Sequence, residues 1–249
     1  MFLWRRLATW QWWNDHEETL RAKFGDQLAV IERPGRKRLQ IEIVCASPVP
    51  VRKFGGRIEK LPRDWLERFL RLQKTKPLKI GNRHLIIPAG AAFGTGDHAT
   101  TALSLRMLER LTRNWQPGWS LVDLGTGSGI LALAGRCLGA KRAIGIDIDP
   151  TAISTAKENA RRNRIERVKF QTADVRHWRI PPKVDILTAN LFSELLIEIL
   201  PKLRRSRWLI LSGVLREHER EVSRGLKRHK IDIVNVRRRG KWIAIVAKN

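Results

Sequence analysis

The sequence has no tyrosine, only two cysteines and no long uncharged apolar stretch. Cys45 and Cys137 are too few for a disulfide framework, and their spacing is not that of metal ligands, so we expect no bound metal. No apolar run is long enough to span a bilayer, so we expect no membrane contact. The first thirteen residues lack the apolar core of a signal peptide. These absences favour a cytoplasmic protein.

Acidic residues are also scarce. Lys and Arg number 49 against 24 Asp and Glu, which gives a formal net charge of +25. Residues 202–249 alone hold fifteen basic residues and only four acidic ones. A surface of this kind attracts phosphates, so contact with RNA through the basic surface is one expectation. A general drift of the composition toward arginine explains the charge equally well.

Residues 1–75 are predicted to form a small α+β domain. The segment 14–24 predicts a helix, with Asn14 or Asp15 as its N-cap. Segments 27–32 and 39–45 alternate apolar and polar residues around a turn at 33–36, which indicates a β-hairpin.

A second helix is predicted over residues 62–72. Its apolar residues, Trp65, Leu66, Phe69 and Leu72, recur at helical spacing, and we assign this face to the core. Residues 74–80, with Pro77 inside them, predict a linker.

Residues 76–249 are predicted to form a single α/β domain. A strand is expected at 84–87 and a helix from about Thr100 to Arg113. Beyond Ser120, short apolar strands alternate with helices. The predicted strands are 121–123, 142–148, 168–170, 184–189, 208–212, 231–236 and 242–247, and the predicted helices are 130–138, 151–162, 194–203 and 216–229. This alternation predicts a doubly wound, mostly parallel sheet that ends in an antiparallel pair.

A glycine-rich turn, from Asp123 to Gly129, connects a predicted strand to a predicted helix. Its glycines, among them Gly125 and Gly127, allow a tight turn and a close approach of the backbone to a ligand. Dinucleotide-binding folds use nearly the same turn. Asp123, however, would repel a pyrophosphate, whereas it can hold a cationic amino group directly or through water. The turn therefore favours S-adenosylmethionine over a dinucleotide such as NAD.

Two further carboxylates follow predicted strands. Asp147 ends the second strand of the α/β pattern, where a carboxylate can accept hydrogen bonds from both ribose hydroxyls; an NAD site would use the same group. Asp174 follows the strand at 168–170 and can receive the adenine amino group. The alternative for Asp174 is a solvent-exposed acid in a loop.

Asn190 follows the strand predicted at 184–189. In an open α/β sheet this end of the strand faces the ligand crevice. The side-chain carbonyl of Asn190 can accept hydrogen bonds from an amine and align its lone pair with a methyl sulfonium. The alternative is that Asn190 caps the next helix.

The turn-rich segment 92–98 precedes the helix expected from Thr100. Gly94 permits an irregular loop across the cofactor, and Phe93 can wall the site of methyl transfer. Thr101, near the start of the helix, can cap it and contact the methionine carboxylate. His98 is either a base or a structural residue bonded to a loop carbonyl.

Four segments, 93–101, 122–134, 145–163 and 189–196, together resemble the bacterial ribosomal protein methyltransferases that modify the large-subunit protein L-eleven, the PrmA family. The resemblance covers about residues 62–249, and the segment 93–101 is its most specific part. It implies a Rossmann-like class I methyltransferase fold, the cofactor S-adenosylmethionine, and methylation of lysine or other amino groups of a ribosomal protein. It also implies that residues 1–75 recognise the substrate, and that Thr101, Gly125, Asp147 and Asn190 contact the cofactor.

The expected cofactor site combines both lines of reasoning. Its predicted residues are Phe93, Gly94, Thr101, Asp123, Gly125, Gly127, Asp147, Asp174 and Asn190, with Asn190 as the predicted catalytic residue.

Two other functions are compatible with the sequence. The charge favours an RNA methyltransferase, although the segment after the fourth strand lacks the Asn-Pro-Pro-aromatic form suited to gripping a flipped base. A non-catalytic RNA-binding or ribosome-binding module that retains a cofactor fold is the other alternative; cofactor binding would argue against it.

Overall fold

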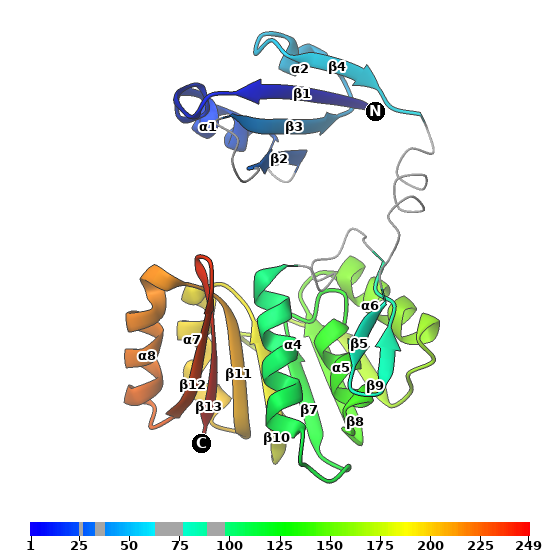
Figure 1. The fold of residues 1–249 in the computed structure, drawn as a ribbon, viewed down its shortest axis with the longest axis vertical. Coiled ribbons are helices and arrows are strands. Elements are labelled where there is room, and N and C mark those ends of the chain that lie inside the picture. Colours follow the sequence, from blue (N-terminus) through cyan, green and yellow to red (C-terminus); the bar gives the residue numbers. More distant parts are fainter. Residues whose placement is uncertain (25–26, 33–37, 63–76, 89–97) are drawn as a thin grey trace. The chain divides into compact units, whose positions relative to one another are not determined.

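The computed structural model describes residues 1–24, 27–32, 38–62, 77–88 and 98–249. It divides the chain into two compact units, Met1–Leu72 and Gln73–Asn249 (Figure 1). The turn predicted at 33–36, almost all of the helix predicted at 62–72, and the glycine loop at 93–96 lie outside the described residues.

The first unit contains a four-stranded antiparallel sheet with the strand order β2-β3-β1-β4. The strands are β1 (Phe2–Ala8), β2 (Leu28–Ile31), β3 (Leu39–Cys45) and β4 (Arg57–Lys60). The helices are α1 (Trp10–Phe24) and α2 (Val49–Arg52). β2 pairs with β3, as the alternation in the sequence predicts. The core gathers apolar residues of α1 and of the sheet, including Trp4, Trp13 and Leu20.

Two features at the start of this unit differ from the sequence-based prediction. β1 was not anticipated, although it is an inner strand of the sheet. α1 begins at Trp10, four residues before the predicted start, and Thr9 Oγ1 accepts a hydrogen bond from the backbone N–H of Trp12 at 3.2 Å. Asn14 and Asp15 therefore lie inside the helix and do not cap it. The helix starts earlier because its first turn buries Trp13.

The second unit is built on a seven-stranded sheet with the order β12-β13-β11-β10-β7-β8-β9. All neighbours from β11 to β9 are parallel, and β13 runs antiparallel between β11 and β12. The strands are β7 (Ser120–Leu124), β8 (Arg142–Asp147), β9 (Val168–Thr172), β10 (Val184–Asn190), β11 (Ser206–Leu215), β12 (Asp232–Arg239) and β13 (Trp242–Lys248). This is the doubly wound, mostly parallel sheet that the sequence predicts.

Helices cover both faces of this sheet (Figure 1). α4 (Ala99–Thr112), α5 (Ile130–Cys137) and α6 (Pro150–Arg162) contribute to one hydrophobic cluster, whereas α7 (Ser193–Leu203) and α8 (Glu219–Arg228) contribute to the other. The helix predicted at 216–229 is shorter than expected, because residues Arg216–His218 form a separate 3₁₀ turn.

A small hairpin precedes the sheet in the second unit. β5 (Leu78–Ile80) pairs antiparallel with β6 (Arg83–Leu85), and both strands bury a residue in the same core cluster as α4 and α5. The linker prediction for 74–80 is therefore wrong for residues 78–80. Ile80 is 2% exposed, and its burial in the core fixes this segment. The sequence favours a linker here only because Pro77 and the nearby lysines are typical of one.

Candidate functional site

The strand order places three predicted site segments at one edge of the sheet. β7 lies between β10 and β8, so the chain leaves β7 toward one side and later returns on the other. Such a reversal of strand order is where open α/β sheets bind ligands, beyond the carboxyl ends of the strands. The glycine turn follows β7, while Asp147 and Asn190 are the last residues of β8 and β10.

The glycine turn needs its glycines for two reasons. Gly125, Gly127 and Gly129 have φ angles of 68°, 52° and 82°, in the left-handed region that favours glycine. A Cβ at Gly125 would also lie 2.4 Å from Leu191 Cδ2, and one at Gly129 would lie 2.9 Å from Ala156 Cβ. The turn is thus pressed against its neighbours, and its bare backbone faces the crevice.

Asp123 lies beneath the turn and is only 1% exposed. Its Oδ2 accepts a hydrogen bond from the Thr126 hydroxyl and its Oδ1 accepts one from the Thr188 hydroxyl, both at 2.6 Å. Burial raises the pKa of Asp123 to about 6, and the two hydroxyl bonds oppose this shift. The carboxylate is therefore positioned to act on a ligand through its charge or through water, because its oxygens do not reach the surface.

Asp147 ties the end of β8 to the glycine turn. Its Oδ2 accepts the N–H of Gly127 at 2.8 Å, and its Oδ1 accepts the N–H of Asp149 at 3.1 Å. A carboxylate oxygen has a second acceptor site, so both oxygens can still bind hydroxyls. The side chain is half-buried, which suits a group shared between the protein and a ligand.

Asp174 lies close to this corner, since the N–H of neighbouring Ala173 donates to the backbone carbonyl of Asp147 at 2.8 Å. Its carboxylate forms a 2.9 Å ion pair with Arg176, and this partner lowers the pKa of Asp174. The structure thus places Asp174 beside the crevice, but with its oxygens already engaged by a cation.

Asn190 meets Thr101 across the crevice. Its Nδ2 lies 3.5 Å from Thr101 Oγ1, a long hydrogen bond, and Thr101 is 1% exposed in the first turn of α4. Asn190 does not cap the next helix, because the N-cap of α7 is Phe192 and no side chain caps it. The structure therefore removes the alternative that the sequence left open for this residue.

His98 occupies the N-cap position of α4. Its Nδ1 lies 2.8 Å from Thr100 Oγ1, and its ring lies edge-on to Trp242 with 5.3 Å between centroids. Burial, and to a smaller extent the charge of Lys241, lower the pKa of His98. These contacts agree with a structural histidine, and the loop that would supply the expected carbonyl lies outside the described residues. Phe93 and Gly94 lie outside the described residues.

Two apolar residues at this edge were missed by sequence reasoning. Ile148, next to Asp147, is 63% exposed, and Phe192, two residues after Asn190, is 75% exposed. Exposed side chains of this size directly beyond two site residues offer apolar faces to a ligand. The signal was present in the sequence, because Ile148 is the last residue of one predicted strand and Phe192 follows shortly after another.

The described parts of the chain offer neither a membrane span nor a metal site. None of the helices described there combines the length and apolar character needed to cross a bilayer. Nor do three or more His, Cys, Asp or Glu side chains gather there closely enough to hold a metal ion.

Known proteins match both the sequence and this geometry. The model of the ribosomal protein L11 methyltransferase (PrmA) family matches residues 62–249. The chain belongs to this family. A ribosomal protein L11 methyltransferase from Alkaliphilus oremlandii is 32% identical over 84% of the chain. The crystal structure of a ribosomal protein L11 methylase from Lactobacillus delbrueckii subsp. bulgaricus superposes with a TM-score of 0.62 at 28% identity, covering 71% of this chain and 90% of that one.

The chain spans only part of the length of the curated relatives that it matches. It spans 74% of the Alkaliphilus protein and 62% of a second L11 methyltransferase, from Symbiobacterium thermophilum, which is 34% identical over 69% of the chain.

Family membership and fold together identify the chain as a class I methyltransferase that uses S-adenosylmethionine. The residues present fit this cofactor. The left-handed glycines form a tight turn after β7 that carries no side chains at these positions, Asp147 offers acceptors for hydroxyls, and exposed Ile148 offers an apolar face for a purine.

Proposed function

We propose that the protein transfers methyl groups from S-adenosylmethionine to lysine or other amino groups of ribosomal protein L11. The observation that carries this proposal is the placement of Asn190 at the end of β10, across from Thr101 and beside the glycine turn. Family membership supports the substrate, because the matched relatives carry its name.

The chain holds the cofactor at the carboxyl edge of the sheet. Gly125 and Gly127 bring the backbone against its amino-acid portion, and Asp147 accepts the ribose hydroxyls. The negative charge of buried Asp123 attracts the cationic amino group. Thr101 contacts the methionine carboxylate at the start of α4.

Ile148 and Asp174 would hold the adenine portion. Ile148 would offer the purine an apolar face, and the Asp174 carboxylate would accept a hydrogen bond from its amino group. From the sequence we also propose Phe93 and Gly94 for the methyl-transfer site; both lie outside the described residues.

The cofactor supplies an electrophilic methyl group on a sulfonium. In the transfer, an N–C bond would form at the substrate amine as the S–C bond breaks, and the sulfur would keep the electron pair and leave as a neutral thioether. Only a neutral amine is nucleophilic, so the lysine loses its proton to solvent before it docks. Oδ1 of Asn190 has no donor among the described residues, so it can accept a hydrogen bond from the amine and point the lone pair at the methyl carbon. Exposed Phe192 packs along the aliphatic stem of the lysine.

We propose that residues 1–75, which include the first unit, recognise the substrate and that residues 76–249 carry out catalysis. The reaction takes place in the cytoplasm, where ribosomal proteins are made. A deletion of residues 1–72 should keep cofactor binding and lose methylation of L11, since the cofactor residues all lie in the second unit.

The direct test is methylation of purified L11. The chain is incubated with L11 and S-adenosylmethionine, and intact-mass and peptide mass spectrometry then locate the added methyl groups. Methyl groups on L11 amines support the proposal. If the same preparation instead methylates ribosomal RNA, the RNA methyltransferase alternative holds; if it binds no cofactor, the non-catalytic module does.

The net charge of the chain bears on where the enzyme binds its substrate. A free ribosomal protein is itself basic and would be repelled by a chain of net charge +25. We propose that the enzyme meets L11 on RNA, in an assembling or assembled subunit. Initial rates on free and RNA-bound L11 over a range of salt concentrations test this, and faster reaction on free L11 at low salt would contradict it.

A further inference from the structure

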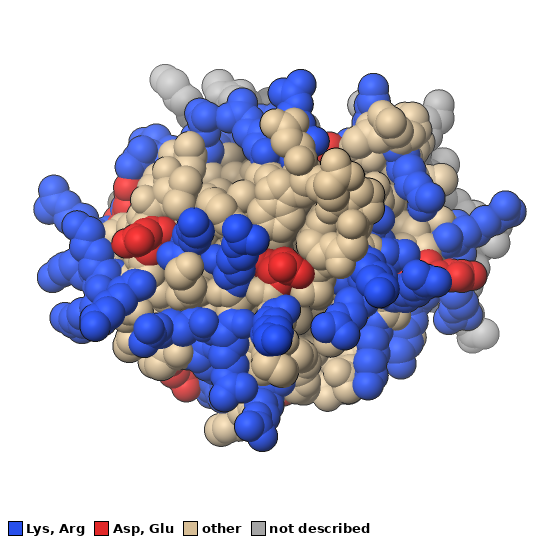
Figure 2. All heavy atoms as spheres, turned by 90° about the horizontal axis from the view of Figure 1, so that it is seen from below, with Lys and Arg blue, Asp and Glu red and all other residues tan. Residues whose placement is uncertain are grey.

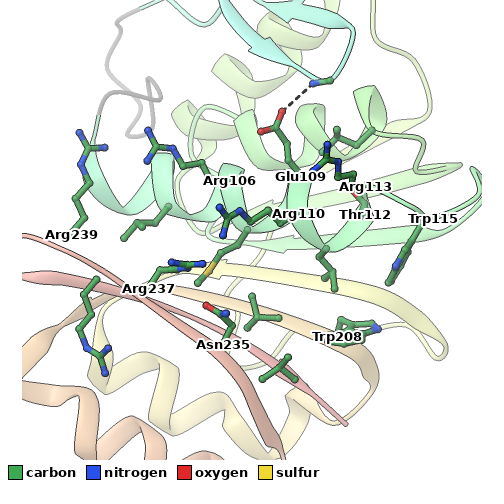
Figure 3. Close-up of a pocket in the computed structure, with 18 of the residues that line it drawn as sticks. Arg106, Glu109, Arg110, Thr112, Arg113, Trp115, Trp208, Asn235, Arg237 and Arg239 are labelled. Carbon is green, nitrogen blue, oxygen red and sulfur yellow. Dashed lines mark hydrogen bonds between the residues drawn. The ribbon is translucent and has the colours of Figure 1, made fainter.

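A groove of about 1140 Å³ runs between α4 and the β12–β13 pair in the second unit. None of the described residues of the cofactor site lines it. Figure 3 shows arginine side chains projecting from the helix on one side and from the strand on the other. The groove is therefore a separate feature, and almost all of the charged residues that line it are arginines.

The secondary structure explains why arginines line both walls. Arg106, Arg110 and Arg113 follow one another at intervals of four and three residues, so they lie on one face of α4. Arg237 and Arg239 alternate along β12, so they lie on one face of the strand. Arg238, between these two, forms an ion pair with Glu219 at the start of α8. The groove thus collects six arginines, and Arg238 is the one among them with an ion pair in the described parts of the chain; the other five carry the charge considered next.

The charges in the groove are not neutralised. Within the described parts of the chain, none of the five arginines forms an ion pair, and all five are exposed. The one carboxylate that lines the groove, Glu109, accepts the N–H of Gly81 at 3.0 Å (dashed in Figure 3). Guanidinium groups bind phosphate oxygens in a forked, bidentate manner. A polyphosphate chain is therefore the complementary ligand.

Two tryptophans line one end of this groove. Trp115 and Trp208, with 6.4 Å between ring centroids, also line a second cavity of about 460 Å³, so the groove continues past them. Trp208 pairs with Lys248 where β11 begins and β13 ends. Figure 2 views the molecule from that end and shows Lys and Arg side chains spread around a largely uncharged centre. Aromatic faces beside cations are what single-stranded nucleic acids bind by stacking.

We propose that this groove binds a single-stranded segment of RNA, with its phosphates on the arginines of α4 and β12 and a base stacked on Trp115. An acidic peptide would use the charges but not the tryptophans, and lysine would serve it as well as arginine. The inference does not depend on methyl transfer, because it rests on the charge and shape of a surface outside the cofactor site.

Binding of a labelled single-stranded oligoadenylate to the full chain, without cofactor, tests the proposal. Fluorescence anisotropy is measured at several salt concentrations for wild type, for Arg106→Gln with Arg237→Gln, and for Arg220→Gln with Arg228→Gln on α8. Both doubles remove two positive charges from exposed positions. The groove double should weaken binding about 10-fold and reduce the slope against log salt by about 1, whereas the α8 double should change affinity less than about 2-fold.

A base-stacking contribution is tested with Trp115→Leu. It should weaken oligoadenylate binding several-fold and leave inorganic polyphosphate binding unchanged. An equal loss of oligoadenylate affinity in the two arginine double variants would show that the groove is not the binding site. Equal affinity of the wild type for oligoadenylate, polyphosphate and polyglutamate would overturn the assignment to RNA. Thermal unfolding checks that each variant is folded; if the groove double is not, Arg110→Gln with Arg239→Gln repeats the test.

Discussion

Asn190 and Thr101 meet at the candidate site although 89 residues separate them, with 3.5 Å between Nδ2 of the amide and Oγ1 of the hydroxyl. Thr101 is fixed in the buried first turn of α4, whereas Asn190 ends β10 and is half-buried. The contact engages the nitrogen end of the amide. In the proposed function the carbonyl oxygen accepts from the substrate amine, and α4, through Thr101, would set the direction in which this oxygen points.

Replacing Asn190 should therefore slow the chemical step more than it weakens cofactor binding. We expect Asn190→Ala to lower kcat about 100-fold, because the amine loses its alignment. The Kd for S-adenosylmethionine should change only a few-fold. Single-turnover rates and calorimetric titration separate the two quantities. Asn114→Ala, at an exposed position outside the site, is the control and should match wild type. Full turnover by Asn190→Ala with normal cofactor binding would remove this role.

Asp147 should dominate cofactor affinity. In Asp147→Asn a charged acceptor becomes a neutral amide that cannot accept at both ends, and we expect the Kd for S-adenosylmethionine to rise about 10- to 100-fold. Asp149→Asn is the matched control. Asp149 caps α6 by accepting from the N–H of Thr151, and asparagine caps equally well. Equal Kd values for the two variants would show that Asp147 does not bind the ribose.

Substitutions at two glycines with similar φ angles can separate the cost of backbone strain from the cost of a steric clash at Cβ. Gly125 and Gly240 have φ angles of 68° and 58°, but a Cβ at Gly240 has no atom within 4 Å. Gly240→Ala should cost about 1 to 2 kcal/mol of unfolding free energy from strain alone. Gly125→Ala adds the 2.4 Å contact with Leu191. It should cost more in chemical denaturation and also weaken S-adenosylmethionine binding, which Gly240→Ala should leave intact. The same loss of stability and affinity in both variants would contradict the close packing of the turn.

Asp123 should make stability depend on pH with an unusual sign. Its pKa in the folded protein is raised to about 6 from 3.8 by burial. The unfolded chain therefore ionises first as pH rises, and folding loses stability between about pH 4 and pH 6. The loss is about 3 kcal/mol for a shift of this size. The free energy of unfolding is measured with denaturant for wild type and Asp123→Asn across this pH range. The difference between the two isolates the contribution of Asp123, because all other carboxylates are present in both proteins. We expect the wild type to lose unfolding free energy relative to the variant as pH rises. Parallel curves of unfolding free energy against pH would contradict the raised pKa of Asp123.

The βαβ core could be predicted because local signals agreed with the tertiary structure. Strands β7 and β10 each contain a short apolar stretch, as buried parallel strands do, and a glycine turn follows β7. The amino-acid sequence alone places Asp123, Asp147 and Asn190 at one edge of the sheet, because carboxyl ends of parallel strands share an edge. That Asp123 would be buried under two hydroxyls could not be foreseen, since Thr188 comes from another strand.

The first unit was harder to predict. β1 has arginines at positions 5 and 6, which hid the burial of Trp4 and Ala8 on its inner face. Arg5 is accommodated by Glu42 on β3, a partner remote in sequence. The start of α1 was misplaced because Asn14 is a stronger capping type than Thr9. In both places the structure is determined by tertiary packing, which local sequence preferences do not reveal.

The most direct test of the proposed function uses labelled S-adenosylmethionine and a ribosomal lysate. After incubation with wild type or Asp147→Asn, protein and RNA are separated and the label in each fraction is measured. We expect the label in the protein fraction, on amino groups of L11, and strongly reduced labelling with Asp147→Asn. Label recovered in RNA, or labelling of L11 that Asp147→Asn leaves unchanged, would contradict S-adenosylmethionine-dependent methylation of L11 at this site.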